Sequence, residues 1–321
     1  MRNSIVNHLE VLAAKDSDIM LLVGDLGFGV IENFKQKFPK QFINVGVAEQ
    51  NLTGVATGLG LIGKKSITYS IGNFNTFRCL EQIRNDALYH QVNLTIVSIG
   101  GGFSYGQLGY SHHATEDYGV LNTLPEISIY TPGSKSEAIL CIENCLNNDG
   151  VSYLRIDKSH FHEKDHKKGL PKDTNPRELF CGDETLIIGV GGILEEAFEV
   201  VNFFKEKLNK NIGLVSLPKI KPLNKKLLLN IMRDYKNIIV KNKSIILIDD
   251  SLVRGTTCLK IVKMLYEAGA KEVHVRIACP EIKFPDFYGV DMPTRKELLA
   301  FQKTNEEMCQ HIKAKSLKFL S

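Results

Sequence analysis

Glu49 is the first residue along the chain whose surroundings suggest chemistry. It is the only carboxylate in the stretch FINVGVAEQNLTGVATGLGLIG, which begins at Phe42. The apolar start of this stretch predicts a strand, and its Gly- and Ala-rich end predicts a helix that can approach another backbone closely. A single Glu at the start of a helix can simply favour the positive end of the helix dipole. The residue type alone therefore leaves both a structural and a chemical role open.

A second candidate lies in the stretch SIILIDDSLVRGTTCLKIV, which begins at Ser244. It predicts a buried strand ending in Asp249 and Asp250, followed by a Gly/Thr-rich turn and a helix. Two adjacent carboxylates can accept hydrogen bonds from vicinal hydroxyls, and main-chain N–H groups of the turn can bind a phosphate at the start of the helix. The pattern therefore predicts a sugar-phosphate site. The residues of its loop are Ser251, Arg254, Gly255, Thr256 and Thr257.

The elements that would position these residues alternate between strand and helix. Strands are predicted at 18–26, 66–72, 93–100 and 127–132, and helices at 29–38, 49–63, 77–90 and 134–148. Such alternation is typical of parallel strands with crossover helices, so we expect an α/β fold with a doubly wound parallel sheet over residues 1–158. Residues 159–178 are polar and charged, which favours an interdomain linker over a metal site for their histidines. The remaining residues alternate again and predict a second, smaller α/β domain.

The bulk composition excludes several classes of protein. The chain has 321 residues, of which 43% are hydrophobic and 24% charged, as in ordinary globular proteins. A net charge of +4, with lysines and acids interspersed, gives little support to nucleic-acid binding. No apolar run approaches the ~20 residues that span a bilayer. The seven cysteines have no framework spacing, which favours reduced thiols, so we expect a cytoplasmic protein.

The front of the chain resembles a known family. The motifs FINVGVAEQN, YSIGNFNTFRCLEQIRND, SYGQLGYSHHATEDYGVLNTLPEISIYTPG and YLRIDK occur in this order. They are similar in order and spacing to the pyrimidine-binding domain of transketolase-like thiamine diphosphate enzymes, most of all to the C-terminal subunit of split transketolases. The resemblance covers about residues 1–240. It implies a pyrimidine-binding domain at 1–158 and part of a transketolase C-terminal domain at 179–240.

The resemblance assigns catalytic roles to two residues. It places Glu49 against N1′ of the aminopyrimidine of thiamine diphosphate, where a buried acid stabilises the imino tautomer that deprotonates the thiazolium carbon. It places His112 over the oxygens of a sugar phosphate substrate, for general acid or hydrogen-bonding work. The expected reaction is transfer of a two-carbon ketol unit between sugar phosphates.

Four further roles also follow only from the resemblance. Phe74 would stack on the aminopyrimidine, and Arg78 and Gln82 would form the wall of the cofactor pocket. Arg155 would bind a phosphate or carboxylate of the substrate. For Phe74 the alternative is an ordinary core aromatic.

The sequence also departs from the family. Leu108 stands where larger transketolases carry an Asp, which leaves the sugar specificity open. The domain that binds the diphosphate and Mg²⁺ through a Gly-Asp-Gly motif is missing, so no metal site is expected in this chain. We therefore expect an N-terminal transketolase subunit as partner, in a homodimer or a heterotetramer, and no activity from this chain alone.

Residues 241–321 resemble a different family, the C-terminal part of amidophosphoribosyltransferase. The resemblance implies that Asp249 and Asp250 bind the ribose hydroxyls of phosphoribosyl diphosphate and that Ser251–Thr257 bind its 5′-phosphate. The N-terminal nucleophilic cysteine of that family is missing, since position 2 is Arg2. Three interpretations stay open: a split transketolase subunit, a phosphoribosyl-diphosphate fragment or binding module, and a non-functional chimera of the two.

Overall fold

The fold is taken from a computed structural model, which describes residues 1–157, 161, 169–242, 259, 262–263, 274–277 and 298–319. The chain divides into two compact units. One comprises Met1–Asp234 and Val240–Ser244, and the other comprises Tyr235–Ile239 and Ile245–Ser321. The predicted boundaries at 158, 178 and 240 stay predictions.

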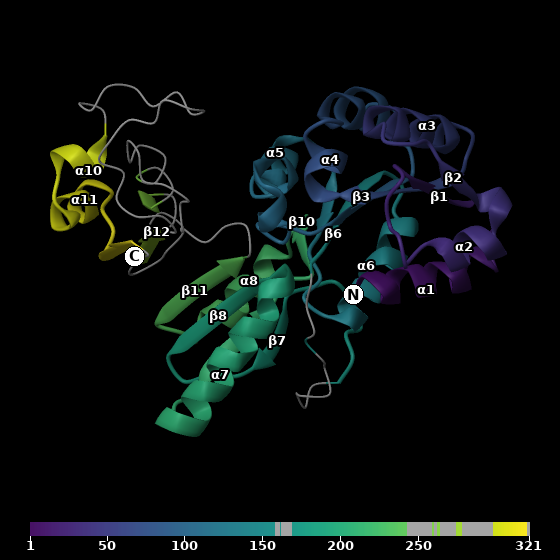
Figure 1. Cartoon of the computed structure of the whole chain (residues 1–321). Coiled ribbons are helices and arrows are strands. Elements are labelled where there is room, and N and C mark those ends of the chain that lie inside the picture. The colour runs from purple at the N-terminus through teal and green to yellow at the C-terminus, as the bar shows by residue number, and fades with distance from the viewer. Residues whose placement is uncertain are drawn as a thin grey trace. The chain divides into compact units, whose positions relative to one another are not determined.

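A seven-stranded sheet forms the centre of the first unit (Figure 1). Its strand order is β10-β5-β6-β4-β3-β1-β2. The strands are β1 (Ile19–Val23), β2 (Phe42–Asn44), β3 (Lys65–Ile71), β4 (Leu94–Ile99), β5 (Ser128–Tyr130), β6 (Val151–Ile156) and β10 (Lys219–Lys221). All neighbours are parallel except β10, which lies antiparallel to β5. The α/β fold with a mostly parallel sheet is thus confirmed.

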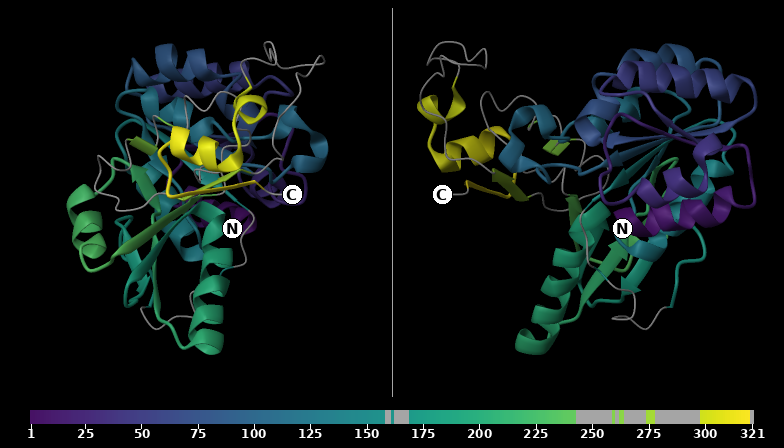
Figure 2. Two further views of the ribbon diagram at one scale, coloured as in Figure 1. Left: turned by 90° about the vertical axis from the view of Figure 1, so that its left-hand side faces the viewer. Right: turned by 45° about the vertical axis from the view of Figure 1, so that its right-hand side comes forward.

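Helices cover both faces of this sheet. Figures 1 and 2 show one group of helices on each side. One face carries α1 (Arg2–Ala13), α2 (Glu32–Lys37) and α6 (Lys135–Leu146), and the other carries α3 (Glu49–Leu61), α4 (Gly72–Thr76) and α5 (Asp117–Thr123). Strands β1, β4 and β6 are buried along their whole length, because both faces are covered. In the sequence β1 is a continuous apolar run and the other two are mostly apolar.

The segments between these elements include short helical turns. The helix predicted at 77–90 contains a π-helix, η2 (Gln82–Leu88), and π-turns are frequent at functional sites. The chain between β4 and α5 contains two 3₁₀ turns, η3 (Gly106–Leu108) and η4 (Tyr110–His112). The predicted His112 therefore lies on a loop at the carboxyl end of β4.

A second, four-stranded sheet lies in the same unit except for residues 237–239 of one edge strand, which fall in the second unit. Its order is β11-β8-β9-β7, with β8 and β9 parallel and β7 antiparallel to β9. The strands are β7 (Arg177–Phe180), β8 (Thr185–Val190), β9 (Ile212–Ser216) and β11 (Asn237–Asn242), and the helical elements are η6 (Gly191–Ile193), α7 (Leu194–Leu208) and α8 (Lys225–Met232). Strand β7 begins inside the predicted linker. Beyond β9 the chain returns to the first sheet as β10, and it then enters the second sheet again as β11.

The second unit has its own small core. Strands β12 (His274–Ile277) and β13 (Ser316–Phe319) pair in parallel, and α10 (Leu299–Gln302) and α11 (Asn305–His311) pack against them. The loop residues from Asp249 to Thr257 lie outside the described residues. Among the helices that the structure describes, none is long and apolar enough to cross a membrane.

Candidate active site

Glu49 lies at the start of α3 and is completely buried. The hydroxyl of Ser70, near the end of β3, donates a hydrogen bond to its Oε1 at 3.2 Å. The guanidinium of Arg78 donates to its Oε2 at 2.6 Å. A Cβ atom on Gly24 would lie 3.4 Å from Oε1, so the turn after β1 also closes over the carboxylate. The carboxylate is therefore held at both oxygens in a site shielded from water.

Phe74, Arg78 and His112 form a stack next to this carboxylate. The guanidinium carbon of Arg78 lies 4.7 Å from the centre of the Phe74 ring, and the ring of His112 lies 5.0 Å from it on an edge-to-face approach. Phe74 comes from α4, while His112 comes from η4. The structure thus brings four of the predicted site residues together, each from the carboxyl end of a parallel strand, where ligands of such sheets bind.

The arrangement suits a flat heterocycle that carries an N–H donor. Arg78 presents a planar, delocalised group that covers an aromatic face and donates to a buried carboxylate. Its side chain is 44% exposed, so it has room to turn toward solvent when another donor takes its place. A planar ring in the place of the guanidinium would contact the same acceptor, the carboxylate of Glu49, and the same aromatic ring, that of Phe74.

The thiol nearest this site is inert. Cys79 follows Arg78, is fully buried, and donates a hydrogen bond to the carbonyl oxygen of Phe74 at 3.3 Å. Burial raises the pKa of this thiol to about 11. It therefore carries no negative charge near neutral pH and does not act as a nucleophile.

Gln82 and Arg155 lie outside this group. Gln82 begins η2, and in the described part of the chain its buried Oε1 has no hydrogen-bond partner. Arg155 lies in the middle of the sheet on β6 with 0% exposure. Its partners are protein carboxylates, Asp117 at 2.9 Å and Asp157 at 3.6 Å. Binding of a substrate anion by Arg155 stays a prediction, and in this structure carboxylates of the chain itself face the guanidinium.

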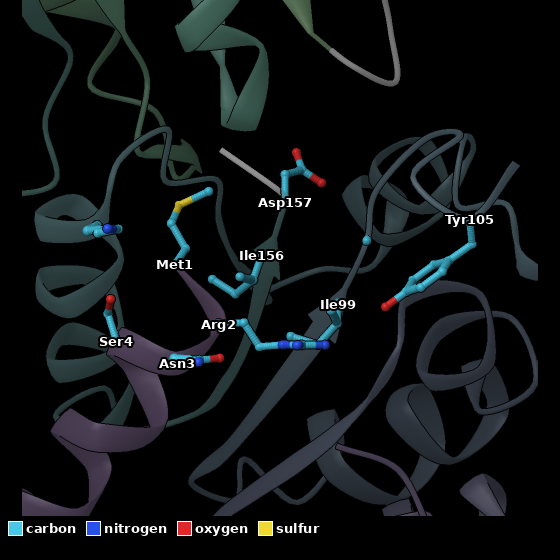
Figure 3. Close-up of a pocket in the computed structure, with 10 residues that line it drawn as sticks. Met1, Arg2, Asn3, Ser4, Ile99, Tyr105, Ile156 and Asp157 are labelled. Atoms are coloured by element: carbon cyan, nitrogen blue, oxygen red, sulfur yellow. The ribbon is translucent and has the colours of Figure 1, made fainter. Parts of the chain in front are cut away.

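A cavity of about 400 Å³ lies at the carboxyl ends of β4 and β6 (Figure 3). It is lined by the first four residues of the chain and by Ile99, Gly100, Tyr105, Lys135, Ile156 and Asp157. Figure 3 shows the side chain of Arg2 reaching toward Ile99 and Tyr105. Neither Arg2 nor Lys135 has an ion-pair partner within the ranges that the structure describes. The lining thus holds two cations and one carboxylate, Asp157, which is paired with Arg155, so the cavity is suitable for a small anion.

The sequence motifs did not single out Arg2, Lys135 or Ser70 for these positions. For Lys135 a signal was present, because it follows the strand predicted at 127–132 and carboxyl ends of parallel strands meet at one edge. The same signal was present for Ser70, which lies near the end of the strand predicted at 66–72. Arg2 has no such signal, since its neighbours come from distant parts of the chain.

Known proteins resemble this chain over most of its length. The model of the family described as "Transketolase, pyrimidine binding domain" matches residues 1–163, just over half of the chain. A subunit of the apulose-4-phosphate transketolase from Actinobacillus succinogenes is 28% identical over 242 residues, which cover 75% of each protein. A solved structure titled "Split gene transketolase, inactive beta4 tetramer" superposes with a TM-score of 0.66 at 25% identity, covering 75% of this chain and 78% of that one.

A second similarity covers fewer residues and has a higher sequence identity. Amidophosphoribosyltransferase from Staphylococcus epidermidis is 55% identical over 83 residues, which are 26% of this chain and 17% of that enzyme. The chain therefore spans only a small part of that relative.

Proposed function

Because the chain belongs to the family of transketolase pyrimidine-binding domains, we propose that it is one subunit of a split enzyme that transfers a two-carbon ketol unit between sugar phosphates. The observation that carries the proposal is the buried carboxylate of Glu49 beside the ring of Phe74. The family implies thiamine diphosphate as the cofactor, which when bound supplies a nucleophilic thiazolium carbon.

The residues at this site fit an aminopyrimidine ring. Glu49 would hold a proton at N1′ of that ring through Oε2, because Ser70 already holds Oε1. Phe74 would stack on the ring in the place that Arg78 now covers. Arg78 would then turn outward and border the ring, together with Gln82 four residues further along the chain. Burial excludes water from the carboxylate, so the proton moves between Glu49 and the ring alone.

His112 and the cationic cavity supply the contacts for the substrate. His112 lies against Phe74 and is only half-buried, so its ring can donate a hydrogen bond to a substrate oxygen. Ser111 fixes one ring nitrogen, with its hydroxyl oxygen 3.0 Å from Nδ1. Arg2 and Lys135 would bind the anionic end of the substrate in the cavity of Figure 3. Leu108, in place of an acid, removes one partner for a substrate hydroxyl.

A partner subunit would complete the site. Large apolar side chains are exposed on the turns after β1, β2 and β4, with 76% exposure for Phe28, 72% for Val47 and 77% for Tyr110. The three turns follow the carboxyl ends of parallel strands, and a contiguous surface of such side chains would mark an interaction site. The partner would be an N-terminal transketolase subunit with a Gly-Asp-Gly motif. It would bind the diphosphate and supply most of the ligands of Mg²⁺.

Reconstitution tests this proposal. Thiamine diphosphate with Mg²⁺ should raise the melting temperature only after the N-terminal subunit is added, and the complex should transfer a ketol unit. Glu49→Gln should abolish the transfer with the fold intact, whereas Glu206→Gln, an exposed change on α7, should leave it unaltered. Full activity of the Glu49→Gln complex would overturn the assignment.

The match to amidophosphoribosyltransferases supports a second candidate. Asp249 and Asp250 would bind the ribose hydroxyls of phosphoribosyl diphosphate, and Ser251–Thr257 its 5′-phosphate. This ligand should then raise the melting temperature without any partner subunit, and Asp249→Asn with Asp250→Asn should remove the shift. No shift in the unaltered chain would leave these residues as the inactive part of a chimera.

A further inference from the structure

Arg155 and four other buried side chains form a cluster. The guanidinium donates to both carboxylate oxygens of Asp117, at 2.9 and 3.2 Å, and lies over the ring of Tyr118 at 3.7 Å. The hydroxyl of Tyr153 donates to Asp117 at 2.7 Å. Asp157 lies on the other side of the guanidinium at 3.6 Å. We call these five residues the Arg155 cluster.

The loop that carries His112 is attached to the Arg155 cluster at both ends. At its start, the N–H of Gly101 donates to Asp157 at 2.7 Å. A Cβ atom on Gly101 would lie only 2.2 Å from Nε of Arg155, so the loop backbone packs directly on the guanidinium. At its end, Asp117 is the first residue of α5 and binds the same guanidinium.

Further contacts close the loop between these ends. Gly102 and Ala114 exchange main-chain hydrogen bonds at 2.7 and 3.0 Å. These bonds join the segment before His112 to the segment after it. The side-chain amide of Asn73 donates to the carbonyl oxygen of His113 at 2.8 Å. The loop therefore has few ways to move once its two ends are fixed.

A buried ion pair of this kind adds little stability by itself. Taking a carboxylate and a guanidinium out of water costs about as much as their attraction returns, and apolar replacements of similar volume are often as stable. The effect of the pair is geometric, because a planar guanidinium fixes the direction of each partner. In this structure one partner, Asp117, directly follows the loop, and the other, Asp157, accepts a hydrogen bond from Gly101 at its start.

We infer that Arg155 is a positioning residue, which fixes the loop from Gly100 to Glu116 so that His112 lies against Phe74. It acts from inside the sheet, through Asp117 and Asp157, and does not contact the substrate. The inference rests on the proposed function only for the importance of His112. The position of the loop itself can be measured on the chain without any partner or cofactor.

The test compares loop motion with motion of the sheet. Amide hydrogen exchange of Gly101, Gly102 and Ala114 is measured by NMR, with the amide of Val97 in β4 as internal reference, together with the ring signals of His112. Arg155→Met combined with Asp117→Asn removes the guanidinium and the carboxylate closest to it, while Asp157 keeps its hydrogen bonds from the N–H groups of Gly101 and Gly192. Arg155→Lys keeps the charge and loses the planar fork. Ser216→Ala removes a buried hydrogen bond to Glu137 and serves as the matched control.

The inference predicts a local effect. Exchange of the three loop amides should become at least tenfold faster relative to Val97 in the double variant, with a shifted or broadened His112 signal. Arg155→Lys should give an intermediate change, and Ser216→Ala none. Unchanged loop exchange in a folded double variant would overturn the inference. So would failure of both Arg155 variants to fold, because Arg155 would then serve the fold as a whole.

Discussion

The contact between Glu49 and Arg78 gives a prediction that needs neither cofactor nor partner. The carboxylate is fully buried, the guanidinium is 44% exposed, and their N–O distance is 2.6 Å. The perturbation is a double-mutant cycle with Glu49→Gln, Arg78→Met and the two combined. The cycle isolates the interaction free energy of the pair from the other effects of each change.

The size of the coupling follows from the geometry. At an effective dielectric constant of about 20, two unit charges at this distance attract by roughly 6 kcal/mol, which is a gross upper limit. After desolvation, hydrogen bonds to charged groups contribute about 1.5–3 kcal/mol. Because Arg78 is partly exposed, solvent screening places the expected coupling near the lower end, at about 1.5 kcal/mol.

Chemical denaturation of the four proteins measures this coupling. The matched control is the pair of Lys64 and Asp18, which has the same distance of 2.6 Å but is exposed at both ends, with 32% and 54% exposure. Such surface pairs contribute about 0.2–1 kcal/mol. If the Glu49 pair gives no more than the control pair, the carboxylate is not shielded as described, and the argument that it works in a dry site fails.

Three further predictions concern other parts of the chain. Gly101→Ala should destabilise the first unit by about 1–3 kcal/mol in urea denaturation, because the added methyl group overlaps the guanidinium of Arg155; an unaltered midpoint would contradict the packing. At pH 8 Cys79 should be alkylated at least 100-fold more slowly than the exposed Cys181, since its raised pKa of about 11 leaves roughly one thiol in a thousand ionised. Equal alkylation rates of the two thiols by mass spectrometry would refute the burial of Cys79. Because the folded chain loses this thiol proton at a higher pH than the unfolded chain, the free energy of unfolding should also fall as the pH rises from 9 to about 11. Thr304→Ala removes the N-cap of α11 and should lower the stability of the second unit by about 1 kcal/mol, which hydrogen exchange of that helix measures.

Much of the fold could be predicted because its strands are buried on both faces. Mostly apolar runs such as LTIVSI at Leu94–Ile99 identify them without an alternating pattern. The grouping of Glu49, Phe74 and His112 agrees with the rule that parallel strands end at one edge. Strand β10 was not predicted, because its three residues are too few and too polar to form a pattern.

Arg155 shows where sequence reasoning fails. Its motif YLRID places a charged residue between apolar neighbours and says nothing about what faces the side chain. The carboxylate that neutralises it, Asp117, lies 38 positions earlier in the chain. Only the packing of α5 against the sheet brings the two together, and packing between distant segments cannot be read from local composition.

The short strand β10 determines where a recombinant fragment of the protein can end. It lies at the outer edge of the central sheet, antiparallel to β5, while the matched family region ends at residue 163. A fragment that ended there would leave β5 as an unpaired edge strand. The free peptide groups of such an edge can pair with strands of other molecules, which promotes aggregation. A recombinant fragment should therefore extend through Lys221, beyond the end of the matched family region, to keep this sheet edge covered.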